Sequence, residues 1–203
     1  MGKSKNDPHK RNKTRESEVP VISIDYSFLT DKEDLQQMPT LNMIDRHTNY
    51  FHCEIVPRKG ADQHAATTLR TFLENTGYTK VVLKSDQESS ILALIALVKS
   101  QTRIQIVPEQ SPAYDHASNG LIEQAICKST AQQRTLRIAL EMNTGQSIEC
   151  NWDIVPWLAR HSGNILCWQP RDDTGRSPYH LLKGRKFKQK LAEFGETVYF
   201  LEC

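Results

Sequence analysis

Short apolar runs alternate with polar stretches along the first third of the chain, and they predict three β-strands at residues 20–26, 39–46 and 50–56. The acidic stretch 30–37 between the first two strands predicts a loop. The polar residues 45–49, Asp-Arg-His-Thr-Asn, are typical of a tight turn between the second and third strands. This pattern indicates a meander of three strands joined by a loop and a hairpin.

The pattern then changes to an alternation of helices and strands. Apolar positions recurring every three or four residues predict a helix over 61–75. The short, continuous apolar run 81–85 is typical of a buried parallel strand, and the run 91–98 predicts a helix that faces the core on most sides. A fifth strand follows at 103–107, and Pro108 is expected to end it. The order is therefore β-β-β-α-β-α-β.

This order predicts an α/β fold with a five-stranded mixed sheet flanked by helices. Three strands in a meander pair antiparallel, whereas strands separated by a helix pair parallel through a crossover. The same order is that of an RNase H-like core. We expect the first strand to lie beside the fourth strand in the sheet.

The second half of the chain is predicted to be mostly helical. A proline- and serine-containing loop over 108–118 leads to a long helix that begins at Asn119 and ends near 142. A further helix is predicted over 151–167, and Ser-Pro at 177–178 opens a short helix that ends near 183. Residues 194–201 resemble a strand that would start a further module.

The chain is thus divided into three parts. Residues 1–18 are predicted to be a disordered basic tail because they contain almost no apolar residues. Residues 19–145 form the α/β core, and residues 146–203 form a helical extension and the start of a truncated C-terminal module. Trp152, on the helix of this extension, is expected to face the core, and Trp157 is expected to be a core residue as well.

Composition suits one globular domain with extensions. The chain has 203 residues, of which 38% are hydrophobic and 25% charged. Its longest apolar run, 91–98, is far too short to cross a bilayer, so no membrane partner is expected. The first 17 residues are polar and show no secretory signal, and the five cysteines form no Cys-x-x-Cys pair. An intracellular protein with reduced thiols is predicted.

Net charge is only +2, but the cations are unevenly distributed. Residues 1–17 hold six Lys and Arg against two acids, and residues 183–190 hold five Lys and Arg and no acid. Such segments fit contact with a phosphate backbone. Taken singly, each segment is more typical of a solvated tail or a solvated helix face than of a DNA-binding site.

Three acidic residues stand in distinctive local settings. Asp25 ends the apolar run 19–24, and Asp86 follows the run 81–85. Glu123 lies where the loop 111–118 opens a helix. A carboxylate that follows a buried strand is held at the rim of the sheet, and one on a facing helix can complete a cluster there. Such clusters bind divalent metals, and two metals together can drive in-line phosphoryl transfer.

These motifs resemble the catalytic core of retroviral and retrotransposon integrases, which are Asp-Asp-Glu transferases with an RNase H-like fold. The resemblance rests on Ile24-Asp25-Tyr26, on Leu83-Lys84-Ser85-Asp86, and on Pro112-x-Tyr114 followed by Asn119-Gly120-x-x-Glu123. Residues 87–122 separate Asp86 from Glu123, a gap close to that of the family. Residues 174–184 resemble the segment that follows the core in copia-type elements, and the resemblance covers 19–203.

The resemblance implies a mechanism and its cofactors. Asp25 would bridge two Mg²⁺ or Mn²⁺ ions, Asp86 would hold one of them and Glu123 the other. The expected activity is metal-dependent 3′-end processing by water and strand transfer by the 3′-hydroxyl of the element's DNA end. It further implies double-stranded DNA as substrate, a homo-oligomer, action in the nucleus, and an origin in a larger retroelement polyprotein.

Candidate DNA-binding residues surround Glu123. Tyr114, in the preceding polar loop, is a candidate for stacking on a base, and Asn119 for contact with DNA or the metal site. The basic residues expected along the helix are Lys128, Arg134 and Arg137. Arg134 lies about three helical turns after Glu123 and shares its face, whereas Lys128 lies off that face.

Some residues depart from the family pattern. Asp86 is followed by Gln87 and Glu88 where many relatives have glycine, and Glu88 would either compete for metal or favour the start of the next helix. Gln124 stands where relatives often have Arg. Two alternatives therefore stay open: an inactive or domesticated copy that binds nucleic acid, and an RNase H-like nuclease that only hydrolyses.

A zinc site near His52 and Cys53 is not expected. These two residues are adjacent on a predicted strand, so their side chains point to opposite faces and cannot easily share a metal. His47 and His64 are interpreted as ordinary loop and helix residues.

Overall fold

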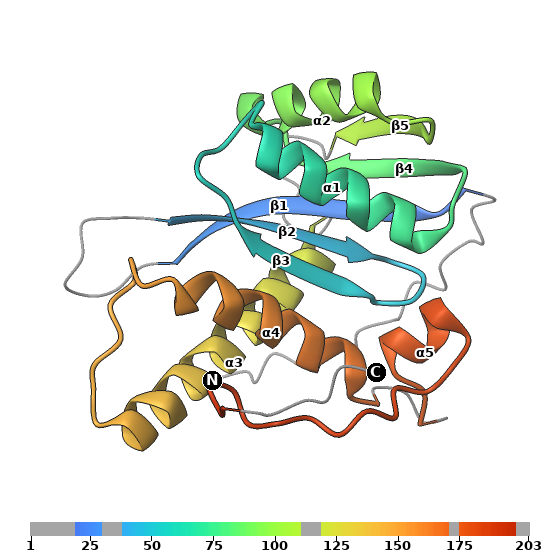
Figure 1. The fold of residues 1–203 in the computed structure, drawn as a ribbon. Coiled ribbons are helices and arrows are strands. Elements are labelled where there is room, and N and C mark those ends of the chain that lie inside the picture. The colour runs from blue at the N-terminus through green and yellow to red at the C-terminus, as the bar shows by residue number, and fades with distance from the viewer. Residues whose placement is uncertain (1–18, 30–37, 111–118, 171–174, 198–203) are drawn as a thin grey trace, which may run out of the picture.

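The computed structural model describes residues 19–29, 38–110, 119–170 and 175–197. Its centre is a mixed five-stranded sheet in the order β3-β2-β1-β4-β5 (Figure 1). The strands are β1 (Val21–Leu29), β2 (Met38–Asp45), β3 (Phe51–Ile55), β4 (Lys80–Ser85) and β5 (Gln105–Gln110). The helices are α1 (Gln63–Thr76), α2 (Ser89–Gln101), α3 (Gly120–Thr144), α4 (Ile154–Trp168) and α5 (Pro178–Lys183). The predicted RNase H-like order of strands and helices is confirmed.

The antiparallel half of the sheet is the meander β1-β2-β3. Its hairpin turn is stabilised by Asp45, a fully buried residue whose carboxylate accepts hydrogen bonds from His47 N at 3.0 Å and from Thr48 Oγ1 at 2.6 Å. Tyr78, in the turn between α1 and β4, donates a third hydrogen bond to Asp45 at 3.0 Å. Asn49 completes the turn with a φ of 58°, a conformation that asparagine tolerates better than most residues. The turn therefore fixes the register of β2 and β3.

The parallel half of the sheet is built by two crossovers. Helix α1 leads into β4, which pairs parallel with β1, and α2 leads into β5, which pairs parallel with β4. Asp62 begins α1 by accepting hydrogen bonds from His64 N at 2.9 Å and Ala65 N at 3.1 Å. Both helices pack on one face of the sheet. The core on this face is largely Ile, Leu and Val, with Ile22, Ile24, Leu69, Leu83 and Leu94 at its centre.

The opposite face of the sheet is covered by α3 and α4 (Figure 1). Ile44 and Phe51 from the sheet pack there against Ile122 and Leu166. Helix α4 approaches β3 closely because Gly163 has no side chain: a Cβ at this position would lie 3.3 Å from Cys53 Sγ. Side chains alternate along β1, so Ser23 and Asp25 face this helical layer while Ile24 and Tyr26 face α1 and α2.

The segment after α5 has no regular secondary structure up to residue 197. Two aromatic contacts hold it against α4: Phe187 stacks on Trp168, with ring centroids 4.2 Å apart, and Phe194 contacts His161 at 5.2 Å. The strand predicted over 194–201 is therefore wrong for residues 194–197. The ring of Phe194 packs on His161 of α4, and residues 194–197 form no strand in the described part of the chain. Residues 198–201 lie outside the described residues.

Three further expectations are corrected. Strand β5 continues through Pro108 to Gln110, which is possible because β5 is an edge strand and one side of it needs no backbone donor. Trp157 of α4 is 67% exposed, whereas Val155 and Leu158 of the same helix are buried as expected. Trp152 is also exposed, and it lies in the turn before α4 because the helix begins at Ile154. No helix within the described ranges is both long enough and apolar enough to cross a membrane.

Candidate active site

Asp25 and Asp86 lie at the same rim of the sheet. The parallel register pairs Ser23 with Lys84, so two residues further along each chain Asp25 is level with Asp86. Asp86 directly follows the last residue of β4. The predicted adjacency of these two strands is confirmed, and it results from the crossover through α1.

The backbone around Asp25 is held by the neighbouring strand. Asn42 of β2 is opposite Asp25 in the antiparallel register and is almost completely buried. Its amide donates to Ser27 Oγ at 2.9 Å, to the Thr40 carbonyl at 3.0 Å and, more weakly, to the Asp25 carbonyl at 3.4 Å. The carboxylate of Asp25 accepts a hydrogen bond from Tyr26 N at 2.8 Å. These bonds fix the direction in which the Asp25 side chain leaves the sheet.

The pKa of Asp25 is raised from 3.8 to about 6. Burial is the largest cause, because it disfavours the charged form, and the negative charge of Asp86 is the next. The hydrogen bond from Tyr26 N acts in the opposite direction, and the charges of Glu88 and Glu123 raise the pKa further. Four carboxyl groups from three elements of the fold therefore share one region at the rim of the sheet.

Glu123 lies in the first turn of α3. Its backbone N–H donates to the Asn119 carbonyl at 3.2 Å, and its side chain is exposed. A carboxylate in the first turn of a helix is favoured by the positive end of the helix dipole. Asn119 occupies the N-cap position as predicted, but its side chain makes no capping hydrogen bond. The charge of Glu123 is close enough to Asp25 to raise the pKa of that carboxyl group, as the smallest of the causes.

Glu88 has a defined local role that the sequence left open. It is the N-cap residue of α2, and its backbone N–H donates to Asp86 Oδ1 at 3.1 Å. Its carboxylate pairs with Lys59 Nζ at 2.6 Å and accepts a hydrogen bond from Ser90 Oγ at 2.7 Å. Burial tends to raise the pKa of Glu88, but the bonds from Lys59 and Ser90 lower it below its usual value.

Lys59 is a residue of this region that sequence reasoning missed. Its ammonium group lies 5.2 Å from the ring centre of Tyr26 and 4.9 Å from that of Phe28, both on β1. The ion pair with Glu88 therefore joins the loop before α1 to the start of α2, beside the strand that carries Asp25. No local motif marks Lys59, because its partners are distant in the sequence.

The donor chemistry of this rim fits a divalent metal, but its present geometry is open. Carboxylate oxygens are the ligands that Mg²⁺ and Mn²⁺ prefer, and Asp25, Asp86 and Glu123 supply them. Within the described ranges, however, no three His, Cys, Asp or Glu side chains lie close enough together to hold a metal ion. The carboxylates interact through their charges without forming a closed set of ligands.

The predicted DNA-binding residues differ in their surroundings. Lys128 and Arg134 are exposed on α3. Arg137 is half-buried: its Nε donates to Glu141 at 3.0 Å, and its guanidinium also donates to the Ile148 carbonyl, so it fastens the loop after α3. Tyr114 lies outside the described residues.

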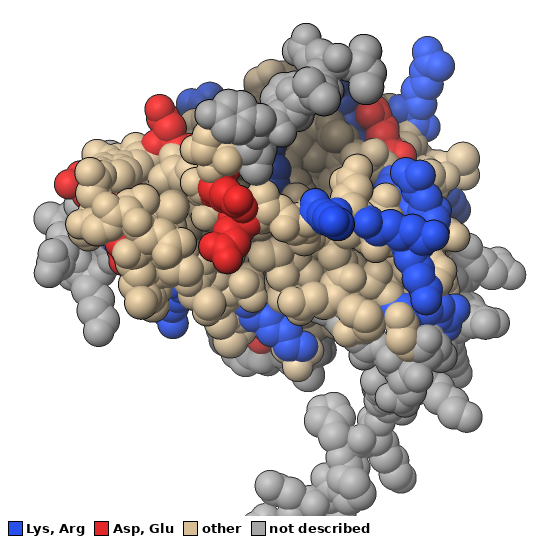
Figure 2. Space-filling view, turned by 60° about the horizontal axis from the view of Figure 1, so that its bottom comes forward, with Lys and Arg blue, Asp and Glu red and all other residues tan. Residues whose placement is uncertain are grey.

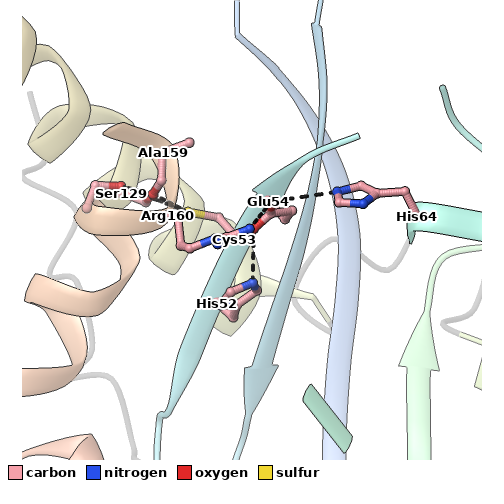
Figure 3. A network of polar contacts seen from close by, with 8 residues as sticks. His52, Cys53, Glu54, His64, Ser129, Ala159 and Arg160 are labelled. Carbon is pink, nitrogen blue, oxygen red and sulfur yellow. Dashed lines mark hydrogen bonds and ion pairs between the residues drawn. The ribbon is translucent and has the colours of Figure 1, made fainter. Parts of the chain in front are cut away.

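A second polar cluster surrounds Glu54 on the edge strand β3 (Figure 3). Its buried carboxylate accepts two hydrogen bonds from Arg160 of α4, at 2.8 and 2.5 Å, and lies 3.4 Å from His52 Nε2 and 3.7 Å from His64 Nε2. Burial raises the pKa of Glu54, but His52 and Arg160 outweigh it and lower the pKa to about 2. The cluster ties β3 to both helical layers.

Cys53 and His52 point to opposite faces of β3, as predicted. Cys53 Sγ donates to the Ala159 carbonyl at 2.9 Å on the α4 side, whereas the ring of His52 lies 6.3 Å from that of Phe72 on α1 (Figure 3). The two residues do not share a ligand site.

Comparison with known proteins places the fold among integrase cores. The catalytic core domain of BIV integrase matches 81% of this chain and 93% of its own, with a TM-score of 0.54 and 16% identity. A second match is a chain in the structure of the simian T-cell lymphotropic virus intasome in complex with PP2A regulatory subunit B56 gamma. It covers 92% of this chain and 63% of that longer chain, with a TM-score of 0.61 and 12% identity. No protein-family model and no curated protein sequence matches. The chain has the fold of an integrase catalytic core.

Proposed function

We propose that this chain is the catalytic core of an integrase-type polynucleotidyl transferase, which processes the 3′ ends of an element's DNA and joins them to target DNA with the help of divalent metal. The observation that carries the proposal is the parallel pairing of β1 with β4, which brings Asp25 level with Asp86 at one rim of a sheet with the fold of integrase cores. Burial and the charges of Asp86, Glu88 and Glu123 raise the pKa of Asp25 at this rim. Mutual repulsion of this kind at a structured sheet rim is typical of sites that need a cation.

The residues have distinct parts in this proposal. Asp25, Asp86 and Glu123 would hold two Mg²⁺ or Mn²⁺ ions, which when bound help to activate the attacking oxygen and stabilise the leaving oxygen. Asn42 and Tyr26 N–H keep Asp25 oriented. Because Glu123 stands at the exposed start of α3, its side chain can approach Asp25 without rearrangement of the sheet.

The partners follow from the same proposal. Double-stranded DNA is the substrate, and exposed Lys128 and Arg134 supply cations near Glu123. The intasome in which one structural neighbour is found supports an assembly of several copies on DNA. An origin in a copia-type retroelement polyprotein, and action in the nucleus, remain part of the proposal on the strength of residues 174–184.

A joining assay with a pre-cut DNA end and Mn²⁺ tests the activity. The wild-type chain is compared with Asp25→Asn, Asp86→Asn and Glu123→Gln, each of which removes a charged ligand and nearly preserves side-chain volume. Glu74→Gln serves as the matched control, since Glu74 is an exposed acid on α1 that pairs with Arg70 of the same helix at 3.7 Å. Joining by wild type and control, with loss in all three variants, is the expected result. Retention of joining in all three variants would refute the mechanism.

The same assay separates the two alternatives. An inactive copy that binds nucleic acid is favoured by one observation, namely that the described carboxylates do not form a closed ligand set. That alternative predicts DNA binding without cleavage or joining. A hydrolytic nuclease would cleave the substrate and release products without joining them to target DNA.

A further inference from the structure

The C-terminal strap, defined here as residues 184–197, combines a dense positive charge with a defined position. Arg185, Lys186, Lys188 and Lys190 all lie in its first half, and their side chains are exposed. Within the described residues, none of these four cations forms an ion pair with an acid at 4.0 Å or less. Their charge is therefore directed to solvent or to a ligand, and it is not used to hold the fold together.

The strap is fastened to the helical layer by its aromatic residues. Phe187 is the only residue of 184–190 that is not exposed. Its ring stacks on Trp168 of α4 at 4.2 Å with 12° between the planes, and meets the edge of Tyr179 of α5 at 5.6 Å. Phe194 makes a second ring contact with the helical layer, against His161 of α4. The two attachments hold Lys188 and Lys190 between them, and Phe187 also anchors the neighbouring Arg185 and Lys186, before any ligand binds.

A groove between α5 and the strap concentrates these cations. It has a volume of about 650 Å³, and its walls include Tyr179, His180, Arg185, Lys186 and Lys188. No acid lines it among the described residues. Figure 2 shows Lys and Arg side chains gathered on the side of this face where α5 and the strap lie. A concave wall with several cations and an aromatic edge fits a chain of phosphodiesters.

The groove is separate from the candidate active site. Lys183, at the end of α5, donates to the Asn75 carbonyl at 2.9 Å, near the end of α1 and therefore near the start of β4. Asp86 follows the opposite end of β4. Figure 1 accordingly shows α5 at the end of the sheet away from the carboxyl ends of β1 and β4.

We propose that the groove between α5 and the C-terminal strap binds the sugar–phosphate backbone of a nucleic acid, at a site distinct from Asp25, Asp86 and Glu123. Binding relieves the repulsion among closely spaced cations, and the aromatic attachments reduce the entropy lost when the strap is ordered. A nucleic acid is favoured over an anionic lipid surface because the cations line a groove and because the aromatic ring among them, Phe187, is turned inward onto Trp168 instead of outward toward a bilayer.

Fluorescence anisotropy of a short labelled DNA duplex, titrated with the full chain in EDTA over a series of NaCl concentrations, tests the proposal. The strap variant is Lys186→Gln/Lys188→Gln. The matched control is Lys99→Gln/Arg103→Gln, which removes the same charge from exposed positions outside the groove. We expect the strap variant to lose roughly tenfold or more in affinity and to show a salt dependence that is weaker by about one for each lysine removed, while the control stays close to wild type.

A second variant, Phe187→Ala, keeps every charge and removes the stack on Trp168. It should weaken DNA binding several-fold while circular dichroism shows the fold retained; if the variant unfolds, the lysine variant alone decides. Equal losses in strap and control variants, or unchanged binding in the strap variant, would overturn the proposal, as would binding to phosphatidylserine vesicles without binding to DNA. Because metal is absent, the result does not depend on the catalytic activity proposed for this chain.

Discussion

Replacing Asp25 with Asn should stabilise the metal-free protein at neutral pH. The carboxyl group of Asp25 has a pKa of about 6 in the folded chain, against 3.8 for an ordinary Asp. A difference of this size corresponds to about 3 kcal/mol of folding free energy, and partial exposure of the side chain reduces the expected gain to about 1–3 kcal/mol. Asn keeps an oxygen that can accept the hydrogen bond from Tyr26 N, so little stabilisation is lost.

The stability difference between Asp25→Asn and wild type should depend on pH. At pH below 3.8 the carboxyl group is protonated in both the folded and the unfolded chain, and the substitution should have almost no effect on stability. Between 3.8 and about 6 the unfolded chain releases its proton before the folded chain does, so the free energy of unfolding of the wild type falls as pH rises. Above about 6 the penalty is fully present, and the advantage of Asn reaches its maximum.

Urea unfolding of wild type and Asp25→Asn at a series of pH values from 4 to 8 measures the effect. Glu74→Gln, at an exposed position of α1, is the control and should leave the free energy of unfolding nearly constant relative to wild type. Addition of Mn²⁺ should raise the Tm of the wild type more than that of Asp25→Asn. A variant that is less stable than wild type at pH 8, or a stability difference that does not change with pH, would show that Asp25 is not held against neighbouring charges.

Three other substitutions test the remaining parts of the structure. Arg160→Met should cost about 2–3 kcal/mol in urea unfolding, because it leaves Glu54 buried without its main cation, and it should weaken the loss of stability that wild type shows as pH falls from 4.5 toward 2. Gly163→Ala should cost about 1 kcal/mol net, since its Cβ would press on Cys53 Sγ, and the cost should disappear in a Cys53→Ala background. Tyr114→Ala should weaken DNA joining with an unchanged Tm, whereas a Tm drop with unchanged joining would indicate a packing role.

The features that the sequence predicts well are those encoded by neighbouring residues. The apolar run before Asp86 and the alternating run around Asp25 each define a strand and its end, and the helix between them requires a parallel crossover. Together with the strand order of an RNase H-like core, which sets β4 beside β1, these two facts place both carboxylates at one rim. The turn at 45–49 is predicted for a similar reason, because Asp45 and Asn49 satisfy the turn with their own side chains and backbone.

The features that the sequence predicts poorly depend on contacts between distant segments. Trp157 is expected in the core because it is a large apolar side chain, but it lies off the buried face that Val155 and Leu158 form, and it is exposed. Pro108 is compatible with β5 only because that strand is at the edge, a fact of topology. The alternating residues near Phe194 resemble a strand, yet an aromatic contact with His161 determines their conformation.

Lys59 and Glu88 explain how the rim accommodates an additional acid. Glu88 stands where glycine is common in the family that the sequence resembles, and its charge adds to the field that raises the pKa of Asp25. Lys59, 29 positions earlier, neutralises much of that charge at 2.6 Å, and the rings of Tyr26 and Phe28 hold its ammonium group there. Tyr26 and Phe28 follow Asp25 on β1, and strand alternation turns them to the other side of the sheet, so the cation compensates Glu88 from the face opposite the Asp25 side chain. The departure from the family pattern is thus balanced locally, and the negative field that would attract a metal is preserved.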